Sequence, residues 1–234
     1  RVQVGHRILI DDGKIDATVV STNDQYLELE ITYPSDKTAK IQSDKGLNFP
    51  DSNLDIPAIT CQDIKDLKFI VKNATAVGIS FAHSPEDVKN LYDELVKLRN
   101  PDFGIIAKIE NRHAVHNLGK ILLTGLTLPK FGILIARGDL AVEMGFENLS
   151  LIQEDILCLC EAAHVPVILA TQILETLAKS GLPTRAEITD AARGHRAECV
   201  MLNKGKFIVE AVKILSLLLK TEQQHNIKKR QNFR

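Results

Sequence analysis

The chain has 234 residues, of which 44% are hydrophobic and 25% charged, with a formal net charge of −1. This composition is typical of a globular protein with enough apolar material for a core. The near-neutral charge argues against a generally basic protein that binds nucleic acid or a membrane surface. No apolar run reaches the ~18–20 residues that a membrane span needs, and no signal-peptide pattern is visible. We therefore expect a cytoplasmic protein without nucleic-acid or membrane partners.

The first residue of the chain and its cysteines indicate the extent of the chain and the compartment of the protein. The sequence begins with Arg1, not Met, inside a strand-like pattern, so we expect a piece of a longer protein. Its length suffices for one large domain, or for one domain and part of another. The four cysteines lie in apolar or amphipathic stretches without metal or redox spacing, so we expect buried, reduced thiols, as in cytoplasmic proteins.

Residues 1–50 consist of short strand-like runs separated by turns, which predicts a small all-β module. Apolar runs flank Asp12 and Gly13, a pair that is typical of hairpins. The segment YLELEI alternates with the period of a half-exposed strand. Residues 44–59 are rich in Asp, Asn, Gly and Pro and predict a linker out of this module.

From about residue 60 the pattern changes to strands that alternate with helices. The strands are apolar on both faces, as expected of a parallel sheet covered by helices. We expect strands at 76–81, 104–109, 132–136, 166–170 and 199–202. We expect helices at 85–98, 113–122, 149–163, 185–192 and 208–219.

Five such units are fewer than the eight of a closed (β/α)8 barrel, the TIM barrel. The expected fold class is therefore α/β, a partial TIM barrel of about five units preceded by part of a small all-β domain. Because open parallel edges are hard to keep soluble, either three units precede Arg1 or a partner covers the edges. The expected divisions are 1–50, 51–222 and a polar, basic tail at 223–234.

Polar side chains gather where the predicted strands end. The second strand ends with Lys108 and Glu110, which are two apart and so point to one side. The third ends in Arg137, Gly138 and Asp139, and Thr171 follows the fourth. Neighbouring parallel strands end at the same edge of a sheet, where α/β proteins carry their chemistry. We therefore expect these residues to converge.

This convergence predicts a site for a divalent metal and an anion. Two nearby carboxylates repel each other unless a cation lies between them, and Mg²⁺ takes one or two carboxylates together with substrate oxygens. Lys108 would add positive charge where a transferring phosphoryl group develops negative charge. Gly138 would let the backbone approach a ligand, with N–H groups available to an anion.

Each residue also has a structural interpretation. Lys108 and Glu110 could form an ion pair at a barrel rim, and Asp139 could cap a helix. Arg137 fits an orienting role at the rim better than a catalytic one. His113 and His116 lie three apart on a predicted helix but have no further ligand nearby, so we interpret them as surface residues. Several strand ends that converge favour the functional interpretation of the set as a whole.

Several ordered motifs resemble the pyruvate kinase family. They are KGLNFPDSNLDIPAI, AKIEN, IARGDLAVEM, VPVILATQILETL and LPTRAEITDAA. Their order and approximate spacing also match, and the resemblance covers nearly the whole chain. It implies that the β module is the end of the lid domain that interrupts this family's barrel, and that the rest is the last five βα units of that barrel.

The resemblance implies an activity and a set of roles. The family transfers phosphoryl between phosphoenolpyruvate and ADP, giving pyruvate and ATP in glycolysis, with Mg²⁺ (or Mn²⁺) and usually K⁺. It forms homo-oligomers, tetramers in the family. The matching positions imply that Lys108 stabilises the transferring group and the enolate, that Glu110 and Asp139 bind Mg²⁺, and that Gly138, Asp139 and Thr171 bind substrate. Lys45 matches a lid-linker lysine that approaches the nucleotide. The family's K⁺ ligands are not in this chain.

The sequence also departs from the family. Asn203 alone precedes Lys204 and Gly205, where the family has a longer Ser-Gly-Glu-Thr-Ala segment, and His83 replaces a usual arginine. Two other hypotheses therefore stay open. One is a degenerate, non-catalytic paralogue that serves as a binding or structural partner. The other is a metal-dependent pyruvate aldolase or lyase, against which the lid module and the PTRAE segment argue.

Overall fold

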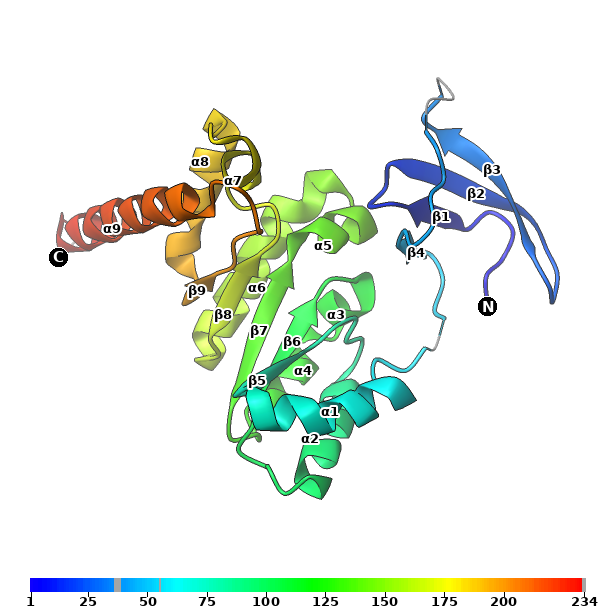
Figure 1. Ribbon diagram of the computed structural model, residues 1–234, viewed down its shortest axis with the longest axis horizontal. Coiled ribbons are helices and arrows are strands. Elements are labelled where there is room, and N and C mark those ends of the chain that lie inside the picture. Colours follow the sequence, from blue (N-terminus) through cyan, green and yellow to red (C-terminus); the bar gives the residue numbers. More distant parts are fainter. Residues whose placement is uncertain (36–38, 55, 233–234) are drawn as a thin grey trace.

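The fold was taken from a computed structural model, which describes residues 1–35, 39–54 and 56–232, with side chains up to residue 224. Two separate sheets organise these residues (Figure 1). A small antiparallel sheet is formed by the first part of the chain, and a parallel sheet surrounded by helices is formed by the rest. The expectation of a mixed α/β chain with a parallel sheet and a preceding all-β part is confirmed.

The antiparallel sheet has the strand order β3-β2-β1-β4. Its strands are β1 (Arg7–Ile10), β2 (Ile15–Thr22), β3 (Leu27–Tyr33) and β4 (Leu47–Asn48). The predicted hairpin lies between β1 and β2, where Ile10 pairs with Ile15 and Gly13 adopts a left-handed φ of 77°. Side chains alternate along these strands, and Ile8, Ile10, Ile15 and Val19 form a small core of their own.

The parallel sheet has the order β5-β6-β7-β8-β9, so strands that are neighbours in the chain are neighbours in the sheet. Its strands are β5 (Ala76–Ile79), β6 (Gly104–Ile109), β7 (Phe131–Ala136), β8 (Val167–Ala170) and β9 (Cys199–Val200). All five expected strands are present. Because they run in sequence and in parallel, their carboxyl ends lie side by side at one edge of the sheet.

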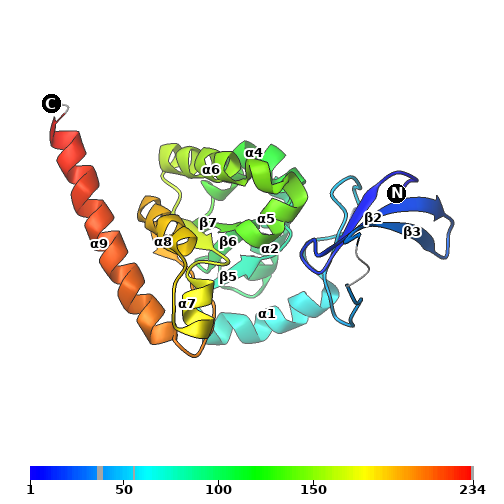
Figure 2. The ribbon, with the colours of Figure 1, turned by 90° about the horizontal axis from the view of Figure 1, so that it is seen from above.

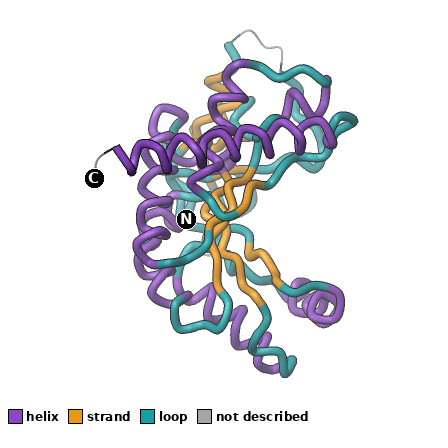
Figure 3. Tube along the Cα trace, turned by 90° about the vertical axis from the view of Figure 1, so that its left-hand side faces the viewer, coloured by secondary structure: helices purple, strands orange, loops and turns teal. Residues whose placement is uncertain are grey.

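Helices occupy the crossovers, and most lie on one side of the fanned strands (Figure 3). They are α1 (Cys61–Asn73), α2 (Pro85–Lys97), α3 (Arg112–His116), α4 (Leu118–Gly125), α5 (Arg137–Met144), α6 (Leu149–Ala163), α7 (Glu175–Ser180), α8 (Arg185–Ala192) and α9 (Ile208–Asn232). Three of them begin with capping boxes, at Thr60, Ser84 and Thr184, in which the cap hydroxyl and a carboxylate three residues later satisfy free backbone N–H groups.

Several helices differ from expectation. The predicted helix at 113–122 is split into α3 and α4, because Asn117 ends one and begins the other. The expected loop at 137–139 is the first turn of α5, so the strand β7 passes directly into a helix. Helices α1 and α7 were not among the expected helices: α7 is too short to show a period, whereas Ile64, Leu67 and Val71 of α1 do follow a helical spacing that could have indicated it.

The two faces of the parallel sheet are packed differently. On β7, Ile133 and Ile135 belong to the main core shared with the helices. The alternating residues Leu134 and Ala136 point to the opposite face and form a smaller cluster with Ala170. Lys108 and Glu110 follow the alternation of Ile106 on this second face, so the sheet's pleat places both charged side chains there.

Helix α9 extends away from the rest of the molecule, on the side remote from the antiparallel sheet (Figure 2). It contains most of the predicted basic tail, whose side chains beyond residue 224 lie outside the described residues. Within the described part of the chain, no helix is long and apolar enough to cross a membrane. The cysteines are free, but only Cys160 is buried, so the expected burial is wrong for the other three.

Candidate functional site

Lys108 and Glu110 face each other at the carboxyl end of β6. The ammonium Nζ of Lys108 lies 3.0 Å from Oε2 of Glu110 and donates a hydrogen bond to Oγ of Ser80 at 2.9 Å. Glu110 is fully buried, whereas the Lys108 side chain is 28% exposed. The ion pair considered from the sequence is therefore present, and it combines an accessible cation with a carboxylate held out of water.

The backbone after β5 fixes Glu110 in place. The N–H of Phe81 donates to Oε1 of Glu110 at 2.5 Å, and Phe81 itself has a left-handed φ of 49°. A bulky residue in that region of φ is strained, so the surrounding structure must hold it there. The other oxygen, Oε2, is buried and lies 3.0 Å from the Lys108 ammonium, with no further donor beside it among the described residues. A divalent cation could therefore share this oxygen with Lys108.

Asp139 lies in the first turn of α5 rather than at its N-cap, which is Ala136. Burial raises the pKa of the Asp139 carboxyl above its usual value, and the negative charge of Glu110 raises this pKa further. The charge of Lys108 lowers it, as does a hydrogen bond from the Asn48 side chain. The two carboxylates predicted to converge therefore interact electrostatically, at the exits of neighbouring strands.

The donor set suits a hard divalent cation. Glu110 and Asp139 are oxygen ligands that repel each other, and a cation between them would remove that repulsion. Among the residues with described placement, no cluster of three or more His, Cys, Asp or Glu side chains could hold a metal ion. A cation held here would therefore complete its coordination with water and ligand oxygens, as Mg²⁺ commonly does.

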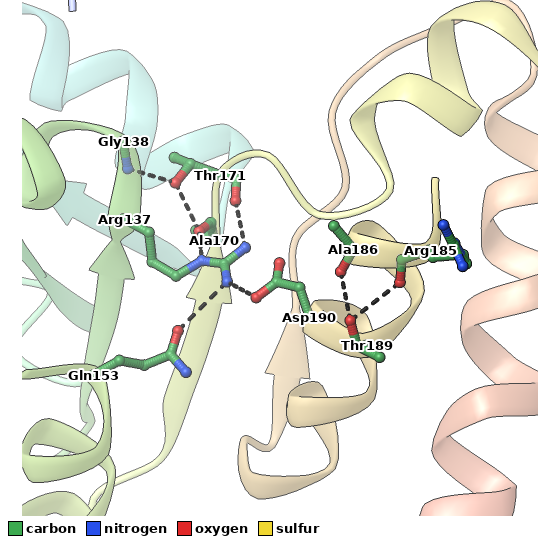
Figure 4. Close-up of polar contacts among 9 residues, drawn as sticks. All are labelled: Arg137, Gly138, Gln153, Ala170, Thr171, Arg185, Ala186, Thr189 and Asp190. Carbon is green, nitrogen blue, oxygen red and sulfur yellow. Dashed lines mark hydrogen bonds and ion pairs between the residues drawn. The ribbon is translucent and has the colours of Figure 1, made fainter. Parts of the chain in front are cut away.

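Gly138 and Thr171 lie in contact across the exits of β7 and β8. The N–H of Gly138 donates to Oγ1 of Thr171 at 2.9 Å, and that hydroxyl donates to the carbonyl of Ala170 at 2.8 Å (Figure 4). The Gly138 N–H, which was expected to be available to an anion, is bonded to the threonine hydroxyl in this arrangement. A ligand would have to displace the hydroxyl from this N–H.

The turn after β8 is held in an unusual backbone conformation. Thr171, Gln172 and Leu174 all have left-handed φ values, of 65°, 58° and 48°. Each such residue costs on the order of 1–3 kcal/mol, and strain of this kind concentrates at functional sites. Thr171 follows the buried Ala170 directly, so the strained turn sets where its hydroxyl points.

Arg137 supports this turn from below. Its buried guanidinium donates to the carbonyls of Ala170 at 3.2 Å and Thr171 at 2.8 Å, and pairs with Asp190 of α8 at 2.5 Å (Figure 4). A weaker contact of 3.4 Å reaches Gln153 on α6. These partners agree with the orienting role expected of Arg137, since each of its three side-chain nitrogens donates to a neighbouring element.

Lys45 lies elsewhere, beside the hairpin of the antiparallel sheet. Its Nζ is 3.0 Å from Oδ1 of Asp11, and its side chain is 34% exposed. The neighbouring Asp12 raises the pKa of Asp139 through its charge, so this hairpin lies near the carboxylate site. Thus Lys108 pairs with Glu110 and both act electrostatically on Asp139, Gly138 contacts Thr171, and Lys45 pairs with Asp11 of the hairpin.

Reasoning from strand exits missed Ser80, Asn48 and Glu143. Asn48 is 5% exposed and Glu143 is 8% exposed, and they are joined by a 3.1 Å hydrogen bond from Asn48 Nδ2 to Glu143 Oε1. Both belong to motifs already noted, KGLNFP and ARGDLAVEM. Nothing in a sequence period distinguishes a buried polar pair from a solvated one, so only their place inside those motifs could have indicated them.

Comparisons with known proteins show which family the chain resembles. A family model described as the barrel domain of pyruvate kinase matches residues 1–212. The chain is 34% identical to pyruvate kinase of Methanocaldococcus jannaschii, covering 96% of this chain and 49% of that protein. It is 36% identical to pyruvate kinase of Candida albicans, over 90% of this chain and 42% of that protein. The chain thus spans about half the length, or less, of these curated relatives.

Proposed function

The chain belongs to the pyruvate kinase family, and on that premise we propose that it carries a site for phosphoryl transfer between phosphoenolpyruvate and ADP, giving pyruvate and ATP. The observation that carries the proposal is the grouping of Lys108 with Glu110 and Asp139 at the strand exits. Phosphoryl transfer requires mainly positioning and charge stabilisation, and this grouping supplies an accessible cation beside a pair of buried or half-buried carboxylates.

Lys108 is the proposed catalytic residue. Its ammonium group is oriented by Glu110 and Ser80, so it would be presented to substrate without a large search over rotamers. In that position its charge would stabilise the transferring phosphoryl group and the enolate oxygen that forms as the phosphoryl leaves. Its partial exposure fits a role in which substrate must reach it.

Glu110 and Asp139 are the proposed ligands of Mg²⁺, or of Mn²⁺ in its place. A divalent cation bound there would neutralise the phosphoryl oxygens and hold the substrate oxygens in place. Buried carboxylates that repel each other are costly in the metal-free protein, and a cation would remove the cost. K⁺, which the family usually requires, would have ligands outside this chain.

Thr171, Gly138 and Lys45 complete the proposal. Thr171 and the backbone of Gly138 and Asp139 would hold the substrate, with the Thr171 hydroxyl turning from the Gly138 N–H to the ligand. Lys45 would approach the nucleotide phosphates from the lid, which we propose comprises residues 1–50, with the partial barrel at 51–222. A cytoplasmic homo-oligomer, as in the family, is part of the same proposal.

One observation favours the alternative of a non-catalytic paralogue. The short segment after β9 is tied to α7: the N–H of Phe207 donates to the carbonyl of Ala178 at 2.8 Å, and Gly205 packs against the same backbone. A β-carbon on Gly205 would lie 2.2 Å from that carbonyl oxygen. Because this segment after β9 is anchored to α7, it has little freedom to contact a ligand bound at the strand exits. A paralogue of this kind would bind the substrate without turning it over.

Pyruvate formation from phosphoenolpyruvate, ADP and Mg²⁺ tests the proposal, measured for this chain and for the full-length protein. We expect Lys108→Met to lower the rate by at least about 100-fold, since it removes a charge that acts on the transition state. Lys179→Met is the matched control, because that lysine is 63% exposed and forms a surface ion pair with Glu175. A full-length protein as slow as Lys108→Met would refute the kinase function, and calorimetric binding of phosphoenolpyruvate without turnover would support the paralogue.

A further inference from the structure

Glu143 is a buried carboxylate to which the proposed chemistry gives no role. It lies on α5, four residues after Asp139, so the two carboxylates occupy one face of the helix a turn apart. With 8% of its surface exposed it is more deeply buried than Asp139. Keeping a carboxylate out of water is costly unless donors compensate it, so its partners indicate what it is for.

Those partners come from two other elements. Nδ2 of Asn48 on β4 donates to Oε1 of Glu143 at 3.1 Å. Arg112 of α3 lies beside Glu143, because α3 packs on α5 and both the backbone N–H and the charge of Arg112 lower the pKa of this carboxyl. Arg112 is the first residue of α3 and follows Glu110 by two positions. Glu143 therefore connects α5 to the exit of β6 on one side and to the antiparallel sheet on the other.

Asn48 extends the connection to Asp139. Its side-chain amide bonds Glu143 and also lies beside the Asp139 carboxyl, whose pKa it lowers, and an amide with two N–H groups can serve both carboxylates. Asn48 is itself fixed, since it pairs with Leu9 of β1 and is 5% exposed. One amide thus holds two carboxylates of α5 in a set relation to the small sheet.

A second contact crosses the same junction. Gly13, in the hairpin of the small sheet, approaches Val142, and a β-carbon there would lie 3.6 Å from Cγ2 of Val142. The hairpin, β4, the first turn of α3 and the last turn of α5 therefore pack around one polar centre, made of Asn48 and Glu143. Movement of the small sheet relative to α5 would break the hydrogen bonds to that centre.

We infer that Glu143 and Asn48 form a positioning pair that sets Asp139 and Glu110 in register with each other and with the small sheet. The pair acts through hydrogen bonds and touches no substrate. The buried hydrogen bond between Asn48 and Glu143 joins the antiparallel sheet to α5. The carboxylates at the strand exits are therefore positioned even when no metal is bound. This inference rests on the proposed function, in which those carboxylates bind the divalent ion.

Binding of Mn²⁺ to the metal-free full-length protein, followed by electron paramagnetic resonance, tests the inference without substrate or turnover. The groups that position metal ligands typically affect metal affinity by about 10- to 100-fold. We expect Glu143→Ala and Asn48→Ala each to weaken Mn²⁺ binding by about tenfold, with the double variant no weaker than either alone. Glu143→Gln, which keeps size and one acceptor, should recover part of the loss. Glu147→Ala, four residues further along the chain, beyond the end of α5 and exposed, is the matched control and should bind as wild type does.

The outcomes separate this inference from the proposal beneath it. Wild-type protein that binds no Mn²⁺ overturns the metal site and, with it, the positioning role. Wild-type protein that binds Mn²⁺, with Glu143→Ala equally tight, overturns the positioning role alone. A double variant that binds Mn²⁺ about a hundredfold more weakly would also overturn the positioning role. That loss equals the product of the two single losses, as expected of independent sites, whose effects add in free energy. Urea unfolding of each variant confirms that it is folded before Mn²⁺ is added.

Discussion

Replacing Arg137 by alanine should destabilise the protein strongly, although the residue takes no part in the proposed chemistry. Its side chain is 7% exposed and donates to partners on β8, on the turn after it, and on α6 and α8. Without the guanidinium, the strained turn at Thr171 loses the group that holds it from below. The effect should therefore combine lost hydrogen bonds with relaxation of the turn.

The loss of unfolding free energy depends on which acceptors are left without a hydrogen-bond donor. The Ala170 carbonyl keeps the Thr171 hydroxyl as a donor, and Asp190, whose side chain is 38% exposed, can be hydrated. The Thr171 carbonyl and Oε1 of Gln153 lose their donor, at about 1–3 kcal/mol for each buried acceptor left unpaired. The Gln153 contact is long, at 3.4 Å, and so weighs less. Arg137→Ala should thus lower the free energy of unfolding by about 3 kcal/mol.

Urea unfolding followed by circular dichroism measures this loss. With an m-value of about 2 kcal/mol/M, the midpoint should fall by about 1.5 M. Arg137→Lys should lose about two thirds as much, because a single ammonium cannot span the carbonyls and Asp190 together. Arg196→Ala is the matched control: this more exposed arginine pairs with Glu154 and Glu161 at the surface, where such pairs contribute under about 1 kcal/mol. Arg137→Ala within about 1 kcal/mol of wild type would refute the reasoning.

Two further predictions concern titrating groups. Burial lowers the pKa of His83, and the charge of His113 lowers it further. The charges of Asp87 and Glu110 raise this pKa, but the net shift is downward. The unfolded chain therefore takes up a proton near pH 6.5 that the folded chain does not, and stability should fall as pH drops from 7.5 to 5.5. Urea unfolding at both values should show a smaller fall for His83→Gln, and an equal fall would exclude the mechanism. In metal-free buffer at pH 7, Asp139→Asn should raise the free energy of unfolding by about 1 kcal/mol, since burial and Glu110 raise the pKa of Asp139 and so disfavour its charge. A less stable Asn variant would contradict this.

Much of the fold could be predicted because its signals are local. Apolar runs bounded by turns indicated the five parallel strands, and the helices α6 and α8 agree with the predicted bounds. The order of the strands followed from their alternation with helices, since parallel neighbours need a crossover. The same rule predicted that Lys108, Glu110 and Asp139 converge, because side-chain period and strand order together fix which exits meet; Lys108 pairs with Glu110, and both act electrostatically on Asp139.

The tertiary structure decided what no period can encode. The Gly138 N–H is taken by Thr171, a pairing that depends on the left-handed turn after β8. Asn48 and Glu143 are 95 positions apart, and they meet only because the small sheet packs on α5. The sequence alone determined which groups stand at the strand exits. Long-range packing decided which of their hydrogen bonds are already satisfied, because a buried donor is paired by whichever distant acceptor the fold brings to it.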